Sequence, residues 1–271
     1  MPGPHLPPSS RPVGDVTRGT THPNRLRRVD RWLVATQLAR LRRAPHPVVV
    51  DLGYGRHPVT TVELADRLAR SGVTAVVVGV EIDRQRVTDA QPHVRPGLRF
   101  ARGGFNLPLA EDERPPAVVR AMNVLRQYDE AAALEAWDVL RAQLGVDGLL
   151  VEGTCDELGR RACWVSVDAA GPRTLTIAAR VEDLERPSDL AERLPKALVH
   201  HHVPGEPVHT FFRAWDEAWL AASGAPSPRQ RWVAAAGALA EQGWRVGRNP
   251  ARWRECELTV SWTAVAPHPK S

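Results

Sequence analysis

Two apolar runs, PVVVDLG at 47–53 and AVVVGVEID at 75–83, constrain the fold of this chain more than any other feature of its sequence. Each run is short, rich in β-branched residues and free of polar alternation, which is typical of a strand buried on both faces. Between them, residues 59–71 carry apolar side chains at helical spacing, and Gly72 follows as a helix-ending residue. A strand, a helix and a second strand in this order predict a βαβ unit with parallel strands.

The alternation of strand and helix patterns continues along the chain. LRFARGG (98–104), AVVRAMNV (117–124) and GLLVEG (148–153) are further short apolar runs. Strands that alternate with helices of this length are joined by right-handed crossovers into a parallel sheet. Two more strands are predicted near the C-terminus, at WRVG (244–247) and ELTVSWTAV (257–265). We therefore predict an α/β fold with a Rossmann-like, mostly parallel seven-stranded sheet.

Residues 155–227 interrupt this regular pattern. CWVSVDA (163–169) and RTLTIAA (173–179) flank an Ala-Gly-Pro turn and predict an antiparallel hairpin, and a helix is expected around 209–222. We interpret the segment as a small α+β insertion between the fifth strand and its helix. It would form an inserted substrate or cap subdomain over the ligand-binding edge of the sheet.

The remainder of the chain divides into a tail and one domain. Residues 1–23 are rich in Pro and Ser, lack a charged-then-apolar signal pattern and are expected to be disordered. Residues 24–154 and 228–266 would together form the ligand-binding α/β domain. No stretch of 18 apolar residues occurs, which argues against a membrane span.

The cysteines and histidines indicate the compartment of the protein and bear on whether it has a metal site. The three cysteines are an odd number without CxxC spacing, which suits a reducing cytoplasm and supports neither a disulfide framework nor a zinc site. The run His200-His201-His202 cannot converge fully on one ion, because neighbouring strand residues point to opposite faces. We therefore predict a cytoplasmic protein with no metal site.

Glycines and acids at the ends of the first two predicted strands indicate a ligand site. Gly53 and Gly55 directly follow the first strand, where the absence of a Cβ lets the backbone approach a ligand closely. Glu81, at the tip of the second strand, could accept hydrogen bonds from a ribose diol. Dinucleotide binding is the competing interpretation, but the third glycine of GxGxxG is missing, and Asp51 would repel a pyrophosphate. The pattern favours an adenosine ligand that carries a cationic amino-acid moiety.

The pair VVVDLGYG (48–55) and VVGVEID (77–83) resembles the first two motifs of the class I S-adenosylmethionine-dependent methyltransferase family. The resemblance covers roughly residues 47–153 and resumes at 228–265. It implies S-adenosyl-L-methionine as cofactor and methyl transfer to an O or N nucleophile as activity.

The resemblance also assigns cofactor contacts. The residues implied around the glycine turn and the ribose are Asp51, Gly53, Tyr54, Gly55, Glu81 and Ile82. Asp51 would organise the turn and the amino-acid moiety, directly or through water. Many family members end the third strand in Gly-Asp-Ala, whose acid reads adenine. Gly104 stands at that position here, so Phe105 stacking, Asn106 or backbone groups would read adenine instead.

The methyl-transfer edge of the family lies at the end of the fourth strand, which here reads AMNVLRQYDE. Asn123 and Tyr128 are therefore candidate catalytic residues, and Arg126 lies between them. An ordinary strand-end cap for Asn123 and a core position for Tyr128 remain equally open. His201 is a candidate general base, because histidine has a suitable pKa for removing an acceptor proton.

The sequence leaves the methyl acceptor open. A small molecule is favoured, because no RNA-binding module is recognisable. RNA is the competing acceptor, with Arg25, Arg27 and Arg28 as candidate phosphate contacts in a segment rich in arginine. The same motifs are also compatible with a catalytically degenerate methyltransferase-like binding module and with an NAD-dependent oxidoreductase.

Overall fold

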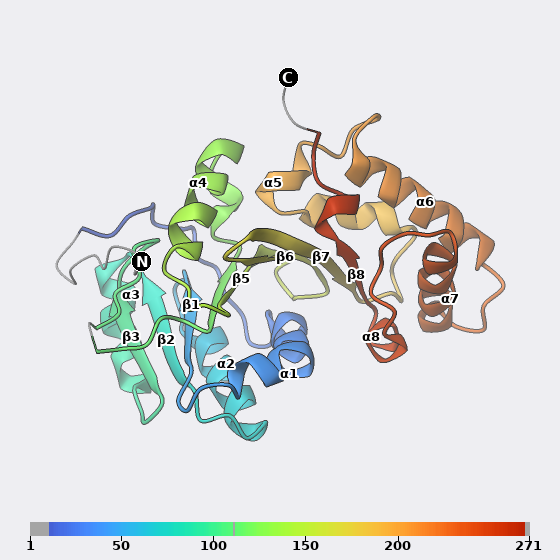
Figure 1. Ribbon diagram of the computed structural model, residues 1–271. Helices are drawn as coiled ribbons and strands as arrows, with labels where there is room; N and C mark the ends of the chain where they lie inside the picture. The colour runs from blue at the N-terminus through green and yellow to red at the C-terminus, as the bar shows by residue number, and fades with distance from the viewer. Residues whose placement is uncertain (1–10, 111, 269–271) are drawn as a thin grey trace.

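The computed structural model describes residues 11–110 and 112–268, which contain one eight-stranded sheet in the order β3-β2-β1-β4-β5-β6-β7-β8 (Figure 1). The strands are β1 (Val48–Leu52), β2 (Val76–Glu81), β3 (Leu98–Arg102), β4 (Val118–Met122), β5 (Leu149–Cys155), β6 (Arg161–Asp168), β7 (Gly171–Ala179) and β8 (Glu257–Ser261). The α-helices are α1 (Arg27–Leu41), α2 (Val59–Arg70), α3 (Arg84–Ala90), α4 (Glu130–Arg141), α5 (Lys196–Val199), α6 (Pro207–Ala221), α7 (Pro228–Glu241) and α8 (Pro250–Arg254). Short 3-10 helices add η1 (Gln91–His93), η2 (Leu125–Gln127), η3 (Pro187–Arg193) and η4 (Trp262–Ala264).

The five strands predicted from apolar runs up to residue 153 are confirmed as the parallel half of the sheet. β1 pairs with β2 on one side and with β4 on the other, and β3 and β5 extend these pairs outward. All residues of β1 and β4 and most of β2 are buried, as the largely apolar runs require. The chain continues from β1 to β2 on one side of this central pair and from β4 to β5 on the other side. In open α/β sheets, ligands bind at the carboxyl ends of such a pair.

The other half of the sheet differs from the prediction of seven strands. β5 turns directly into β6 through residues 156–160, and the β6–β7 hairpin continues the same sheet in antiparallel pairing up to β8. The expected strand 244–247 is reduced to one isolated bridge, between Val246 and Val260. The hairpin lies beside β5 because the short turn at 156–160 brings β6 back antiparallel to β5.

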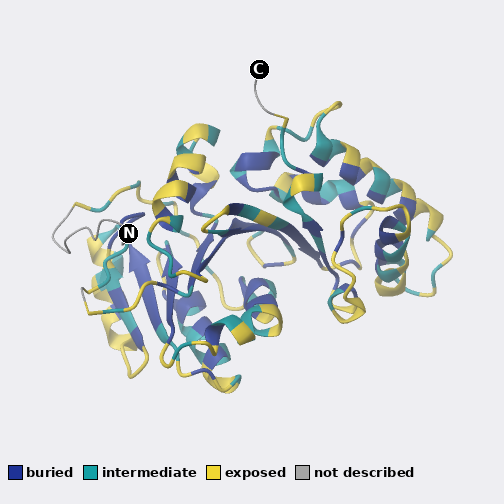
Figure 2. Cartoon of the chain, viewed as in Figure 1, coloured by how far each residue is buried: buried dark blue, intermediate teal, exposed yellow. Residues whose placement is uncertain are grey.

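Helices cover both faces of the sheet and form two apolar cores (Figure 2). Side chains of α4, α5, α6 and α7 pack on one face, and side chains of α1, α2 and α3 pack on the other, because successive residues of each strand point to opposite faces. Residues 155–227 thus share the sheet and its core with the rest of the chain. None of the helices in the described ranges is long and apolar enough to cross a membrane.

The N-terminal segment differs from the expected disordered tail over residues 11–23, while residues 1–10 lie outside the described residues. Residues 13–20, called the strap below, run in an irregular extended path along the carboxyl edge of the sheet. The Phe105 N–H donates to the Val13 carbonyl (2.8 Å), and the Arg56 N–H donates to the Gly19 carbonyl (2.9 Å). These long-range backbone bonds hold the strap in place. The local sequence, which is rich in Pro and Gly, does not reveal them.

Candidate active site

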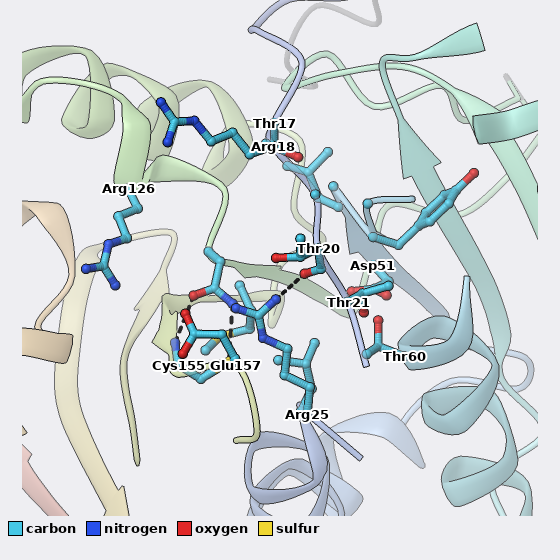
Figure 3. A pocket seen from close by; sticks show the side chains of 18 of the residues that line it. Thr17, Arg18, Thr20, Thr21, Arg25, Asp51, Thr60, Arg126, Cys155 and Glu157 are labelled. Atoms are coloured by element: carbon cyan, nitrogen blue, oxygen red, sulfur yellow. Dashed lines mark hydrogen bonds between the residues drawn. The ribbon is translucent and has the colours of Figure 1, made fainter. Parts of the chain in front are cut away.

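A cavity of about 660 Å³ opens at the carboxyl ends of β1 and β4 (Figure 3). Its walls come from the turn after β1, the ends of β4 and β5, the strap with the residues up to Leu26, and Arg193 of η3. The predicted glycine turn and the predicted methyl-transfer edge therefore lie in one cavity, as the topology of a parallel sheet requires.

The glycine turn is held by Glu81. Gly53 and Gly55 have φ values of 69° and 84°, in the left-handed region that favours glycine. The Gly55 N–H donates to Glu81 Oε2 (3.0 Å), and the Ile82 N–H donates to Glu81 Oε1 (2.9 Å). Arg86 Nη1 lies 3.4 Å from Glu81 Oε2. The carboxylate predicted to bind ribose thus already organises the turn, a role that the sequence analysis assigned to Asp51.

Asp51 instead faces a buried guanidinium. Arg120 Nε donates to Asp51 Oδ1 (2.9 Å), and Arg120 Nη2 lies 2.7 Å from Asp51 Oδ2. Thr61 Oγ1 also donates to Oδ2 (2.6 Å). On its other side Arg120 donates to Asp30 of α1, whose Oδ2 lies 3.3 Å from Arg67 Nε. The negative charge at the floor of the cavity is therefore balanced inside the protein.

Tyr54, the residue between the two glycines, turns its ring into the core against Phe100, with ring centroids 5.4 Å apart. Its hydroxyl donates to the Arg86 carbonyl (3.2 Å), and burial raises the pKa of Tyr54 above its ordinary value. The Tyr54 side chain therefore stabilises the glycine turn from its core side.

The residues predicted to surround adenine lie beside the glycine turn, and the strap occupies the space between them. Ile82, Phe105 and Tyr128 meet residues of the strap around a space of only about 10 Å³. A Cβ built on Gly104 would lie 2.0 Å from the Val13 carbonyl oxygen, so the two backbones are in direct contact. Asn106 Oδ1 accepts from the Val13 N–H (2.7 Å).

The strap also passes directly over the turn. A Cβ on Gly55 would lie 2.7 Å from the Gly19 carbonyl oxygen. Arg86 Nη2 donates to the Thr17 carbonyl (2.9 Å), beside its contact with Glu81. The close backbone approach predicted for a ligand is made here by the chain itself.

Asn123 lies at the end of β4 in the cavity wall, with a φ of 62° that is uncommon for a residue other than glycine. Its Oδ1 accepts from the Cys155 N–H (2.9 Å), and its Nδ2 donates to Cys155 Sγ (3.2 Å). Burial raises the pKa of the Cys155 thiol, so the sulfur stays protonated at neutral pH. Asn123 thus ties β4 to β5 at the site, and strained backbone of this kind clusters at functional sites.

The other two candidate catalytic residues occupy different places. Tyr128 packs on Phe105, with ring centroids 5.5 Å apart, and its hydroxyl accepts from the Asp15 N–H of the strap (2.5 Å). Burial raises the pKa of Tyr128, which makes it a poor base. His201 is outside the cavity wall: its Nε2 lies 2.8 Å from Glu130 Oε1 and its Nδ1 lies 3.6 Å from Glu206 Oε1. The structure therefore brings Asn123 and Tyr128 to the site edge but not His201.

The three arginines predicted to contact RNA make bonds within the chain. Arg25 donates to the carbonyls of Thr20 and Asp156, Arg27 to that of Leu158, and Arg28 to that of Glu255. Burial lowers the pKa of Arg28. These bonds join the start of α1 to its neighbours, and they do not support RNA recognition.

Several wall residues were missed by the sequence analysis. Arg18 and Thr17 lie on the strap, Glu157 on the turn after β5, and Arg193 on η3. The cluster of arginines and threonines around Arg18 was visible in the sequence, but nothing local links Arg193 to the end of β1.

No family model and no curated protein matches the chain. Three similar solved structures are magnesium protoporphyrin IX methyltransferase from Synechocystis with bound S-adenosylhomocysteine, the CcbJ methyltransferase from Streptomyces caelestis, and the CMeT domain of the citrinin polyketide synthase. Their identities are 22%, 18% and 17%, with TM-scores of 0.36, 0.35 and 0.39. The matches cover 49%, 62% and 49% of this chain and 55%, 72% and 36% of those chains. A likeness at this level identifies neither the reaction nor the substrate, so the function must be inferred from the site.

Proposed function

We propose that the protein transfers a methyl group from S-adenosylmethionine to an O or N nucleophile of a small molecule in the cavity between β1 and β4. The observation that carries this proposal is the turn Gly53-Tyr54-Gly55 with Glu81 at its centre, beside a cavity large enough for a small ligand. Both glycines and the acid belong to the carboxyl edge of the switch point, where nucleotides bind in α/β folds.

The chain offers groups for each part of the cofactor. Glu81 would accept from the ribose hydroxyls, and Phe105 with Ile82 would enclose the adenine. The turn at Gly53 and Gly55 would line the centre of the cofactor, and Asp51 would face its amino-acid end. Bound there, S-adenosylmethionine supplies an electrophilic sulfonium methyl group.

The residues of the cavity wall would act by positioning. Asn123, fixed by Cys155, would hold the acceptor in line with the methyl group, and a protein wall that excludes water favours the transfer. Glu157 lies in the wall as an exposed carboxylate and could take the acceptor proton. Residues 155–227 contribute Glu157 and Arg193 to the wall, which supports a role of this segment in acceptor choice.

The first test is cofactor binding by calorimetry. We expect S-adenosylhomocysteine to bind the wild type and NAD not to bind. Glu81→Gln should weaken S-adenosylhomocysteine binding about tenfold, because the neutral amide is a weaker acceptor for two ribose hydroxyls. Glu113→Gln, which breaks a pair with Arg99 at the surface, is the matched control and should bind as wild type. Unchanged affinity in Glu81→Gln would remove Glu81 from the cofactor site.

The strap carries a second prediction, because it lies where the nucleoside would bind and must move to admit it. Gly14 has a φ of 114°, and a Cβ there would lie 3.1 Å from the Tyr128 hydroxyl and 3.2 Å from Phe105 Cε2. Gly14→Val should therefore displace the strap and raise the affinity for S-adenosylhomocysteine several-fold. Val16→Ala, at a half-exposed strap position, is the control and should leave the affinity unchanged.

The same observation favours a second candidate function, a degenerate module whose nucleoside site is permanently filled by its own chain. Calorimetry on the Gly14→Val variant separates the two. If neither the wild type nor this variant binds S-adenosylhomocysteine, methyl transfer is excluded and the degenerate module is the better account.

A further inference from the structure

Four arginines from separate parts of the chain line the cavity. They are Arg18 on the strap, Arg25 before α1, Arg126 in η2 and Arg193 in η3. Guanidinium groups placed around one cavity by four different segments make its electrostatic potential positive. The cavity is therefore suited to a ligand of opposite charge.

The acidic side chains of the cavity do not balance this charge. Asp51 and Glu157 are the carboxylates of the wall among the described residues. Asp51 is already paired with Arg120 behind the wall, at 2.7 Å. Glu157 is exposed. The wall therefore keeps a positive excess toward the cavity.

Three of the arginines have donors free for a ligand. Arg18 makes no side-chain hydrogen bond or ion pair in the described ranges, but it lies on the strap, which must move when the nucleoside binds. Arg126 has neither a hydrogen bond nor an ion pair with any residue in the described ranges. The Arg193 side chain is 16% exposed, and its Nε lies 3.3 Å from Glu192 Oε1, while its two terminal nitrogens have no partner in the described ranges. By contrast, Arg25 uses its donors on carbonyls of Thr20 and Asp156.

Arg126 also lies apart from the side of the cavity that carries Asp51 and Thr60 (Figure 3). The backbone of Arg18, by contrast, adjoins Gly19, which contacts the glycine turn. The cofactor would bind on the Asp51 side, and its single carboxylate needs one cation, which Arg25 could supply through Nη2, the terminal nitrogen that donates to neither carbonyl. Arg126 and Arg193 remain, beyond the needs of the cofactor.

We infer that the methyl acceptor is an anionic small molecule, whose carboxylate or phosphate group is held by Arg126 and Arg193. The inference rests on the proposed methyl transfer. Planar guanidinium groups bind both kinds of anion through paired hydrogen bonds, and two of them position a rigid acceptor better than one. The anion would also keep the acceptor nucleophile close to Asn123, which precedes Arg126 by three residues in the same cavity wall.

Anion binding by the full-length protein tests this inference. Inorganic phosphate and succinate are titrated at constant ionic strength into the protein, with and without saturating S-adenosylhomocysteine, and binding is followed by calorimetry. We expect one of the two to bind saturably, and the tighter probe identifies the phosphate or the carboxylate as the group recognised. Arg126→Gln and Arg193→Gln should each weaken binding about tenfold. Arg254→Gln, in the exposed part of α8 away from the cavity, is the matched control and should bind as wild type.

The outcomes separate this inference from the proposed function. S-adenosylhomocysteine binding without binding of either anion overturns the inference alone, and so does equal anion affinity in Arg126→Gln, Arg193→Gln and the control. Anion binding without S-adenosylhomocysteine binding overturns methyl transfer and leaves an anion site. Thermal unfolding of each variant near the wild-type temperature shows that a lost affinity is not a lost fold.

Discussion

Replacing Arg120 with methionine is expected to lower the free energy of unfolding by about 3–5 kcal/mol. Arg120 is fully buried in β4 between Asp51 of β1 and Asp30 of α1, and it also donates to the Thr60 carbonyl of α2 (3.0 Å). Methionine keeps the volume but leaves two buried carboxylates without their shared cation. Burial raises the pKa of Asp30 to about 6 even with Arg120 present, which shows how costly this charge is to bury.

Urea denaturation of matched variants checks this prediction. Arg99→Met removes a partly exposed ion pair with Glu113 and should cost at most about 1 kcal/mol. Adding Asp30→Asn to Arg120→Met should recover part of the lost stability, because one of the two buried carboxylates that have lost Arg120 becomes neutral. A loss below about 1 kcal/mol in Arg120→Met would mean that the buried pairs contribute no more than surface pairs.

The second large effect concerns Glu152 and pH. Glu152 is 1% exposed on β5, Trp137 Nε1 donates to its Oε2 (3.2 Å), and its Oε1 has no hydrogen-bond partner in the described part of the chain. Burial raises the pKa of Glu152 to about 8, although the bond from Trp137 lowers it. The folded protein therefore keeps this proton at neutral pH, whereas the unfolded chain loses it near its ordinary pKa of 4.5.

This difference makes stability fall as pH rises from about 4.5 to 8, because the folded state binds more protons in that window. Glu152→Gln removes the titration, so its stability relative to wild type should increase by about 4 kcal/mol between about pH 5 and pH 8.5. Urea denaturation at both pH values measures this, with the exposed Glu241→Gln as a control that should show no such change. If the wild type and Glu152→Gln differ in free energy of unfolding by the same amount at both pH values, Glu152 is not buried in its uncharged form.

Glu152 also bears on the choice of catalytic residues. Glu152 and Asp156 flank the end of the strand predicted at 148–153, so by sequence position alone either carboxyl is a candidate base. Asp156 instead accepts from the N–H groups of Leu158, Arg160 and Arg161, which forms the turn into β6. Glu152 faces the core below α4. Neither side chain is in the cavity wall, and the packing of the folded chain is what separates such structural acids from Glu157.

Local sequence patterns were sufficient to predict the parallel half of the sheet and the sheet edge at which the cavity lies. Largely apolar runs such as 47–53 and 75–83 have no stable alternative to burial on both faces, and glycines at their ends leave the backbone accessible. Both properties belong to a single segment and do not depend on distant parts of the chain. They therefore gave the positions of Gly53, Gly55 and Glu81, and with them the expected cofactor edge.

Only the tertiary structure shows how distant segments meet at that edge. The β6–β7 hairpin joins the main sheet because β6 pairs with the edge of β5, and no local pattern in the hairpin identifies that edge. The strap covered the glycine turn through backbone bonds that any residue could make. Arg120 balances Asp51 because burial makes an unpaired charge costly. Arg193 reaches the cavity because η3 packs beside β5, where Thr154 Oγ1 donates to the Arg193 carbonyl.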